Sequence, residues 1–175
     1  SAVDTILELN VSNKGIYDLT GIEDFASLTK LDVSFNQLTS LDLTSNIYLE
    51  WLNCQFWNSI EHLDLSNNTL LTYLKVKNND LHTLNIKNGN NINIIGFIST
   101  GNPNLDCIEV DDPSYSSVSP VWSEDNWSSY STNCSLPGCT DSYACNYNPL
   151  AWIDDSSCVF PTDTNLIIVA CDNYS

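Results

Sequence analysis

The chain repeats itself about every 21 residues, and this period constrains its fold more than any other feature. LDVSFNQLTSLDL at 31–43 is followed 21 residues later by LNCQFWNSIEHLDL, with leucines at the same steps. In one series, apolar-x-apolar triplets start every 21 or 22 residues, at Leu9, Leu31, Leu52, Leu74 and Ile95. A second series lies half a period away, where Leu19 is followed by triplets that start at Leu41, Leu63, Leu84 and Leu105.

Each triplet has the period of a short strand that turns two side chains inward and one outward. A single coil of this kind cannot bury its apolar side alone, so neighbouring coils must stack on it. The repeat therefore predicts a mainly β solenoid of about four to five coils, with short parallel strands on two faces and few helices.

Asparagine recurs five residues after the first leucine of several triplets, at Asn36, Asn46, Asn68 and Asn79. An asparagine side chain at a bend can bond backbone groups that the bend leaves unpaired. Trp57 stands at this position in the copy that starts at Leu52. We therefore expect that coil to satisfy its bend in another way.

These features resemble leucine-rich repeats, and more closely the short, Asn-rich repeats of secreted proteins from Bacteroidetes. The resemblance covers about residues 1–134 and includes two segments that look like the end units of the family, GIYDLTGIEDFASLTKL and NPNLDCIEVDD. It implies a solenoid over 1–106 with an N-terminal unit, closed by a C-terminal cap over 107–134. The ligand depends on the exposed columns, because members of one fold bind different partners.

Stacking places equivalent outward positions above one another, so the columns of the first face can be predicted. The column before the triplet contains Lys30, Trp51, Tyr73 and Ile94. The column within it contains Asp32, Asn53, Lys75 and Gly96. The column after it contains Ser34, Gln55, Lys77 and Ile98. The outward side chains of the second face are small and polar, as expected for a solvated scaffold.

Aromatic and cationic residues gather on the first face within one or two coils. The predicted ligand-binding set is Trp51, Phe56, Trp57, Tyr73, Lys75 and Lys77. Aromatic rings beside amide and charged groups suit either a protein hot spot or a platform for sugar stacking. The alternative is that Trp57 folds inward where the asparagine is missing, and that Trp51 covers the edge of a coil.

Charge excludes some classes of partner. The chain has 5 lysines, no arginine and 22 acids, for a net charge of -17, so binding to a nucleic-acid backbone is not expected. An anionic membrane surface is disfavoured for the same reason, and no apolar run reaches the roughly 20 residues that span a bilayer. Residues 101–175 hold 11 acids and no cation, a composition that attracts cations, above all calcium.

Six of the seven cysteines lie between Cys107 and Cys171, which favours disulfides in an oxidising, extracellular or cell-surface compartment. Zinc is disfavoured because there is no CxxC pair and both histidines lie far from the cysteines. Cys54 falls on an inward position and is predicted to be an unpaired core thiol. We predict a Cys107–Cys134 disulfide that holds down a cap formed by Tyr115, Val118, Val121, Trp122, Trp127 and Tyr130.

A hinge is predicted at 135–138, followed by a small acidic, disulfide-rich module at 139–175. Residues 138–158 resemble a motif of secreted marine Bacteroidetes proteins, GCTDxxACNYNPxAxxDDGSC, from which the chain departs at Ser156. Its cysteines correspond to Cys139, Cys145 and Cys158, and Cys171 is a candidate fourth; the three pairings of four cysteines stay open. Hard oxygen ligands make this module a candidate calcium site, formed by Asp141, Asn146, Asn148, Asp154 and Asp155.

No constellation of base, nucleophile or metal ligands emerges, so we expect no enzyme activity and no required cofactor. The leading hypothesis is an extracellular recognition or adhesion module that binds a protein or glycan. The first alternative is a structural spacer or stalk of a large surface adhesin, and the second is an accessory arm of a secreted enzyme. In each case we expect a mature piece of a longer, multidomain secreted chain without membrane insertion. Exposure of Trp51 and Trp57 distinguishes binding from a spacer.

Overall fold

A computed structural model describes residues 5–134, 137–148, 153–154 and 156–160 of the chain. The chain divides into two compact units, Ser1–Thr132 and Asn133–Ser175, which are described separately. Within the described residues, no helix has the length and apolar character that crossing a membrane requires.

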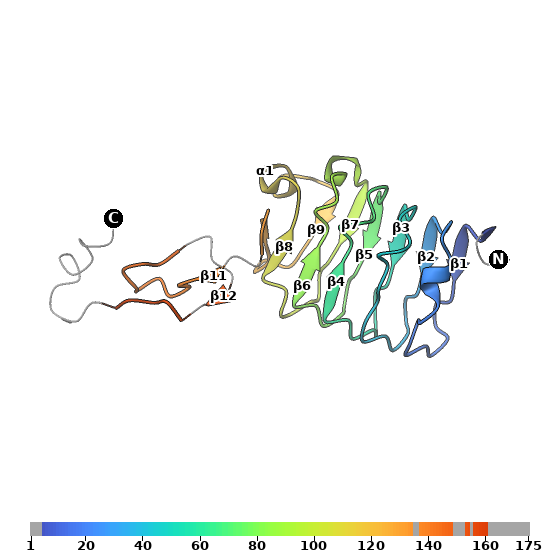
Figure 1. The fold of residues 1–175 in the computed structure, drawn as a ribbon, viewed down its shortest axis with the longest axis horizontal. Helices are drawn as coiled ribbons and strands as arrows, with labels where there is room; N and C mark the ends of the chain where they lie inside the picture. The colour runs from blue at the N-terminus through green and yellow to red at the C-terminus, as the bar shows by residue number, and fades with distance from the viewer. Residues whose placement is uncertain (1–4, 135–136, 149–152, 155, 161–175) are drawn as a thin grey trace. The chain divides into compact units, whose positions relative to one another are not determined.

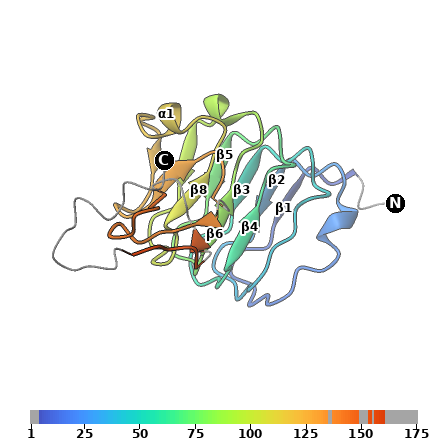
Figure 2. The same ribbon diagram turned by 60° about the vertical axis from the view of Figure 1, so that its left-hand side comes forward.

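The first unit is a parallel β solenoid of the leucine-rich-repeat type, which confirms the predicted fold class (Figure 1). Sheet A contains, in spatial order, β1 (Glu8–Asn10), β2 (Lys30–Asp32), β3 (Trp51–Asn53), β5 (Tyr73–Lys75), β7 (Gly96–Ile98) and β9 (Trp122–Ser123). Sheet B contains β10 (Ser129–Ser131), β8 (Cys107–Glu109), β6 (Thr83–Asn85) and β4 (His62–Asp64). Figures 1 and 2 show both rows of strands running along one solenoid.

Helical structure is limited to single turns in the connections. The 3-10 turns are η2 (Ile22–Asp24) and η3 (Asn91–Asn93), and the one α-helical turn described is α1 (Pro113–Ser116). Asp112 caps α1 by accepting a hydrogen bond from the Ser114 amide. A proline at the first turn suits this cap, because its missing N–H would have no partner there.

The core is a stack of leucine columns contributed by both sheets and by the bends between them. Leu31, Leu52 and Leu74 of adjacent sheet A strands are in register and fully buried. The bends add further fully buried residues, which are Leu28, Leu38, Leu49, Ile60, Leu71 and Leu81. Burying one such side chain stabilises the fold by about 1.5–3 kcal/mol, so each coil gains most of its stability from its neighbours.

The predicted register is wrong in the last repeats. Leu74 pairs with Phe97 rather than with Ile95, because the η3 turn lengthens this coil. Ile94 is buried and Ile95 is 71% exposed. In the three predicted columns of sheet A, the coil of β7 therefore contributes Gly96, Ile98 and Thr100 instead of Ile94, Gly96 and Ile98.

Sheet B shows the same displacement, since Leu84 pairs with Ile108 rather than with a residue of the Leu105 triplet. Ile108 and Val110 supply the inward side chains there, and both are fully buried.

Asparagine side chains bridge successive coils at the bend after sheet A. The members of this ladder are Asn36, Asn58, Asn79 and Asn102. The Asn79 Nδ2 donates to the Cys54 oxygen at 3.0 Å and to the Val76 oxygen at 3.1 Å, one in each of two coils. Such bonds satisfy buried carbonyl groups that no strand pairing reaches.

Trp57 does not replace a ladder asparagine, because Asn58 takes that role one residue later. Its Nδ2 donates to the Val33 and Cys54 oxygens, and its Oδ1 accepts from the Leu38 amide at 2.9 Å. The coil carries one extra residue at the bend, where Phe56 and Trp57 both have positive φ values of 61° and 63°.

The C-terminal end of the solenoid continues the two sheets through β8, β9 and β10. Trp122 is buried and packs on Phe97, with ring centroids 4.8 Å apart, and on Tyr130 at 5.5 Å. Val118, Val121 and Trp127 are exposed, so their predicted place in the closing core is wrong. Three rings of the predicted cap take part in this packing, because Tyr115 and Tyr130 both meet Trp122 edge-on.

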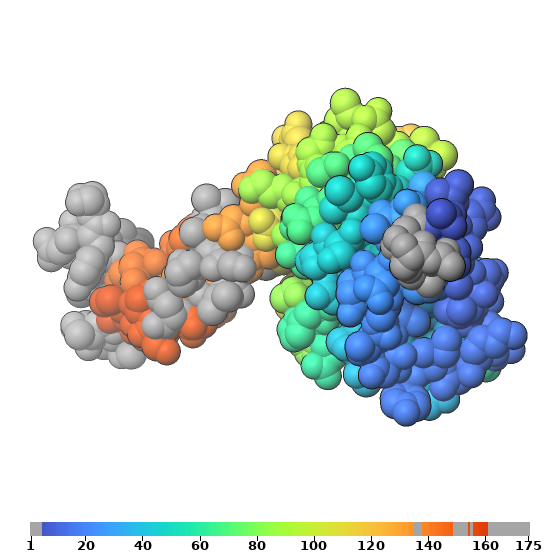
Figure 3. Space-filling model, turned by 45° about the vertical axis from the view of Figure 1, so that its right-hand side comes forward, coloured from blue at the N-terminus to red at the C-terminus, as the bar shows by residue number. Residues whose placement is uncertain are grey.

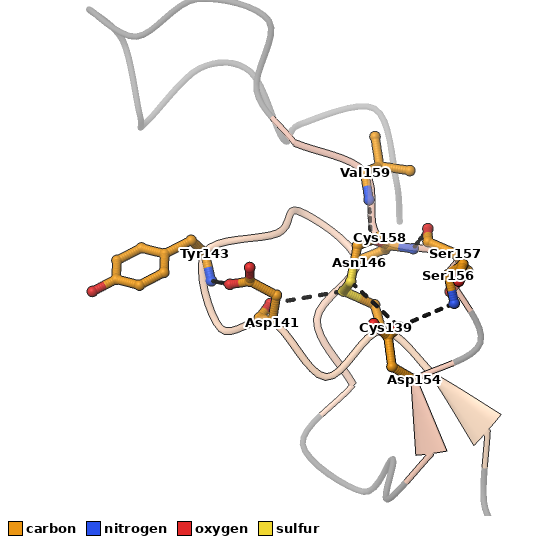
Figure 4. The surroundings of a disulfide bond; sticks show 9 residues. All are labelled: Cys139, Asp141, Tyr143, Asn146, Asp154, Ser156, Ser157, Cys158 and Val159. Carbon is orange, nitrogen blue, oxygen red and sulfur yellow. Dashed lines mark hydrogen bonds between the residues drawn. A yellow bond between two sulfur atoms is a disulfide. The ribbon is translucent and has the colours of Figure 1, made fainter.

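The second unit contains the short parallel pair β11 (Pro137–Gly138) and β12 (Ile153–Asp154) and a Cys139–Cys158 disulfide (Figure 4). Pro137 and Gly138 of the predicted hinge thus lie in a strand, while residues 135–136 are outside the described residues. The disulfide selects one partner for Cys139 among those the sequence left open.

Cys107, Cys134 and Cys145 are also disulfide-bonded. That Cys107 and Cys134 bond each other stays a prediction, and Cys171 lies outside the described residues.

Candidate aromatic binding surface

Two rings stack on the strands of sheet A. Trp51 of β3 and Tyr73 of β5 are neighbours in register, with ring centroids 5.7 Å apart and planes 5° from parallel. The Lys30 ammonium lies 5.2 Å from the Trp51 ring, and a side chain at Gly96 would overlap the Tyr73 ring. We name the rings of Trp51 and Tyr73 the strand pair. Along the solenoid axis, the strand pair is enclosed between Lys30 and the backbone of Gly96.

A second group of rings lies at the bend that follows these strands. The rings of Phe35 and Phe56 stack with centroids 5.0 Å apart, and Trp57 meets Phe35 edge-on at 5.5 Å. The Lys77 ammonium lies 5.9 Å from the Phe56 ring. Trp57 is 74% exposed. We name Phe35, Phe56 and Trp57 the bend cluster. The strand pair, the bend cluster and the lysines around them form the aromatic surface.

The bend cluster occupies left-handed backbone positions that suit other residues better. The equivalent bend positions of neighbouring coils are Asn13, Asn78 and Gly101, also with positive φ. Asparagine and glycine tolerate this conformation, whereas it costs other residues about 1–2 kcal/mol each. Bend formation therefore does not explain why Phe35, Phe56 and Trp57 stand here.

Three of the chain's five lysines lie on the aromatic surface, on a molecule with a net charge of -17. Lys75 also contacts an aromatic ring, with its ammonium 5.2 Å from the Tyr73 centroid. The nearby acid Asp32 uses Oδ1 to accept from the Ser34 amide and hydroxyl, while its Oδ2 accepts from the Asn53 amide group. Asp32 keeps its negative charge and Glu8 pairs with Lys30, so the cationic part of the surface is at Lys75 and Lys77.

All six residues predicted to bind a ligand lie on this surface, in the strand pair, the bend cluster and the adjacent lysines. The alternative in which Trp57 folds inward is wrong, because its ring is mostly exposed and Asn58 fills the inward position. The predicted set lacks Phe35, which the repeat register places beside Phe56. Reading the bend column, as well as the strand columns, would have found it.

The surface is open rather than a deep pocket. A shallow hollow of about 220 Å³ adjoins Trp51 and is lined by Glu8, Leu9, Asn10, Lys30, Asp32 and Trp51. Pockets that enclose small ligands measure about 300–1,000 Å³. The geometry suits contact with an extended or large partner.

The candidate calcium ligands are largely engaged in turns (Figure 4). Asp141 Oδ1 accepts from the Tyr143 amide and Asp154 Oδ1 from the Ser156 amide. Asn146 joins two segments, since its Oδ1 accepts from the Val159 amide and its Nδ2 donates to the Ser157 oxygen.

Asn148 of this set is hydrogen-bonded through its backbone amide to the Cys139 oxygen, and Asp155 lies outside the described residues. Over the described ranges, no group of three or more His, Cys, Asp and Glu side chains is placed to hold a metal ion. Calcium binding stays a prediction.

Cys54 is a buried thiol whose Sγ lies 3.6 Å from the Lys75 oxygen. Burial raises its pKa to about 12, so the reactive thiolate is scarce at neutral pH. His62 and His82 are both exposed, with ring centroids 6.0 Å apart, and His62 Nδ1 lies 3.0 Å from the Thr83 hydroxyl. His62 lies in β4 and His82 just before β6, both in sheet B, whereas Cys54 follows β3 of sheet A.

No protein-family model matches the chain, and no curated protein matches it. The solved structures that match include one described as "Functional domain of InlJ from Listeria monocytogenes includes a cysteine ladder", with 26% sequence identity and a TM-score of 0.49. The match covers 62% of this chain and 30% of that chain, so the present sequence spans less than a third of that structure's length.

Proposed function

We propose that this protein is a non-catalytic, extracellular recognition or adhesion module that binds a protein or glycan through the aromatic surface. The observation that carries the proposal is the bend cluster: the exposed rings of Phe35 and Trp57 and the half-buried ring of Phe56 occupy left-handed positions where adjacent coils have asparagine or glycine. Strained positions of this kind are held by the surrounding structure and cluster at functional sites. Large exposed aromatic residues are also typical hot spots of recognition surfaces.

A spacer without a ligand is the weaker alternative. That role favours buried aromatic residues and an ordinary surface, whereas Trp57 is exposed next to Phe35, and Lys77 lies over the neighbouring Phe56 ring. The disulfide-bonded cysteines support an oxidising compartment. We further propose that the module belongs to a longer secreted chain, with the acidic second unit serving as a connector.

A binding screen with two tryptophan variants tests the proposal. The labelled protein is applied to a glycan array and to a display library of random peptides, and each hit is measured again with Trp57→Ala and Trp127→Ala. Trp127 is the matched control because it is an exposed tryptophan outside the aromatic surface. We expect Trp57→Ala to weaken binding at least tenfold while Trp127→Ala leaves it unchanged. Equal binding by both variants, or no binder in either screen, contradicts the proposed function.

A further inference from the structure

We infer that the ligand is an acidic polypeptide segment with apolar side chains, bound in an extended conformation along β5 and the bend cluster. This inference rests on the proposed function and selects between its two classes of ligand. Three features of the aromatic surface favour a polypeptide: the faces of its rings, its charge, and the spacing of its lysines.

The ring faces argue against a sugar platform. A sugar stacks on the open face of an aromatic ring, but Trp51 and Tyr73 turn their faces toward each other. Lys30 covers the Trp51 ring and the Gly96 backbone lies against the Tyr73 ring. These rings offer edges to solvent, and ring edges pack against other aromatic and aliphatic side chains.

The bend cluster leaves one tryptophan for an apolar contact. Phe35 and Phe56 cover each other, and Lys77 lies over Phe56. Trp57 remains mostly exposed beside Phe35. A single open ring next to a phenylalanine suits one leucine or aromatic side chain of a peptide better than a row of sugar rings.

The charge favours an acidic partner. Among the residues that the structure describes, Lys75 and Lys77 have no carboxylate within ion-pair distance, whereas Lys30 pairs with Glu8 at 3.7 Å. Contact with an aromatic ring orients an ammonium group and leaves its N–H donors available. Most of the molecule is acidic, so an acidic ligand is repelled elsewhere and attracted here.

The lysine spacing favours an extended chain. Lys75 and Lys77 flank the inward residue Val76 and therefore point to the same side. Alternate residues of an extended chain are roughly 7 Å apart, so acids at positions i and i+2 of a peptide can meet both ammonium groups. We expect the pattern acid-x-acid, with a leucine or aromatic residue close by to contact Trp57.

Selection from a random peptide library on the immobilised full chain tests the inference. We expect enriched peptides to contain acid-x-acid next to an apolar residue, and synthetic copies to bind in fluorescence anisotropy titrations. The K75Q/K77Q double variant should weaken these peptides at least tenfold, and raising the salt from 50 to 500 mM should weaken them severalfold. Lys87→Gln is the matched control, because Lys87 lies on the other sheet and donates to the Thr132 oxygen.

The outcomes separate the inference from the proposed function. Enriched peptides without acids, or equal binding by K75Q/K77Q, overturn the acidic ligand. Binding of neutral or anionic glycans with no enriched peptide overturns the inference of a polypeptide ligand. The proposed recognition by this surface still holds in that case, provided Trp57→Ala abolishes glycan binding. Binding that Trp57→Ala leaves intact overturns both. Circular dichroism of each variant confirms that the repeats remain folded.

Discussion

Adjacent residues at one bend have opposite roles. Asn58 is buried and bonded to two coils, while Trp57 is exposed in a strained backbone position. The stability of the bend depends on the first, and we assign ligand contact to the second. Substitutions at these two positions therefore separate folding from recognition.

Asn58→Ala should destabilise the solenoid by about 2 kcal/mol. The Leu38 amide loses its partner in the core, whereas the Val33 and Cys54 oxygens keep bonds from Asn36 and Asn79. Urea unfolding followed by circular dichroism measures the free energy of unfolding. Asn67→Ala, at an exposed position, is the control, and an equal effect of the two changes contradicts the ladder's role.

Trp57→Gly should leave the melting temperature unchanged or raise it, while binding is lost. Glycine relieves a left-handed strain of about 1–2 kcal/mol, which offsets the loss of one contact with Phe35. Calorimetry measures the melting temperature, and the peptide titration measures binding. A fall of several degrees would show that the ring is there for packing.

Cys54 should not react with a thiol reagent in the folded protein. Its burial and its pKa of about 12 keep the thiolate out of reach at pH 8, and unfolding restores an ordinary thiol. Titration with Ellman's reagent, with and without guanidinium, measures the reactive thiols. Rapid reaction in the native state would contradict an inward Cys54.

At the scale of elements, the short strands were predictable because inward leucines alternate with polar residues. The strand registers after Leu74 were not predictable, because isoleucine occurs at several neighbouring positions in 92–98 and each of these positions satisfies an apolar pattern. Only packing selects Ile94 and Phe97 for the interior. The position of Asn58 was not predictable for another reason: the bend absorbs one extra residue, which the triplets do not reveal.

The second unit should depend on its Cys139–Cys158 bond. The bond closes a loop with a sequence separation of 19 residues, for which the lost chain entropy corresponds to about 3 kcal/mol. We expect C139S/C158S to be cleaved rapidly by protease within 139–160 while the repeats stay intact. Mass spectrometry identifies the cut sites, and equal resistance of wild type and variant contradicts this dependence.

At the scale of the whole molecule, an acidic solenoid presents an aromatic surface whose cationic part is at Lys75 and Lys77. Figure 3 shows the coils following one another from blue through cyan to green, and the surface is contributed by several of these coils rather than by one loop. The two-faced solenoid and the crowding of aromatic residues were predictable from the repeat. The contacts that enclose Trp51 and leave Trp57 open were not, because ring orientation depends on neighbouring coils.

The central claim is that ligand meets the aromatic surface at Trp57, and fluorine NMR tests it most directly. The protein is labelled with 5-fluorotryptophan, each resonance is assigned by a Trp→Phe variant, and a selected acid-x-acid peptide is added. We predict that the Trp57 resonance shifts in proportion to saturation while those of Trp122 and Trp127 stay in place. A saturable shift at Trp127 with none at Trp57 would contradict the account.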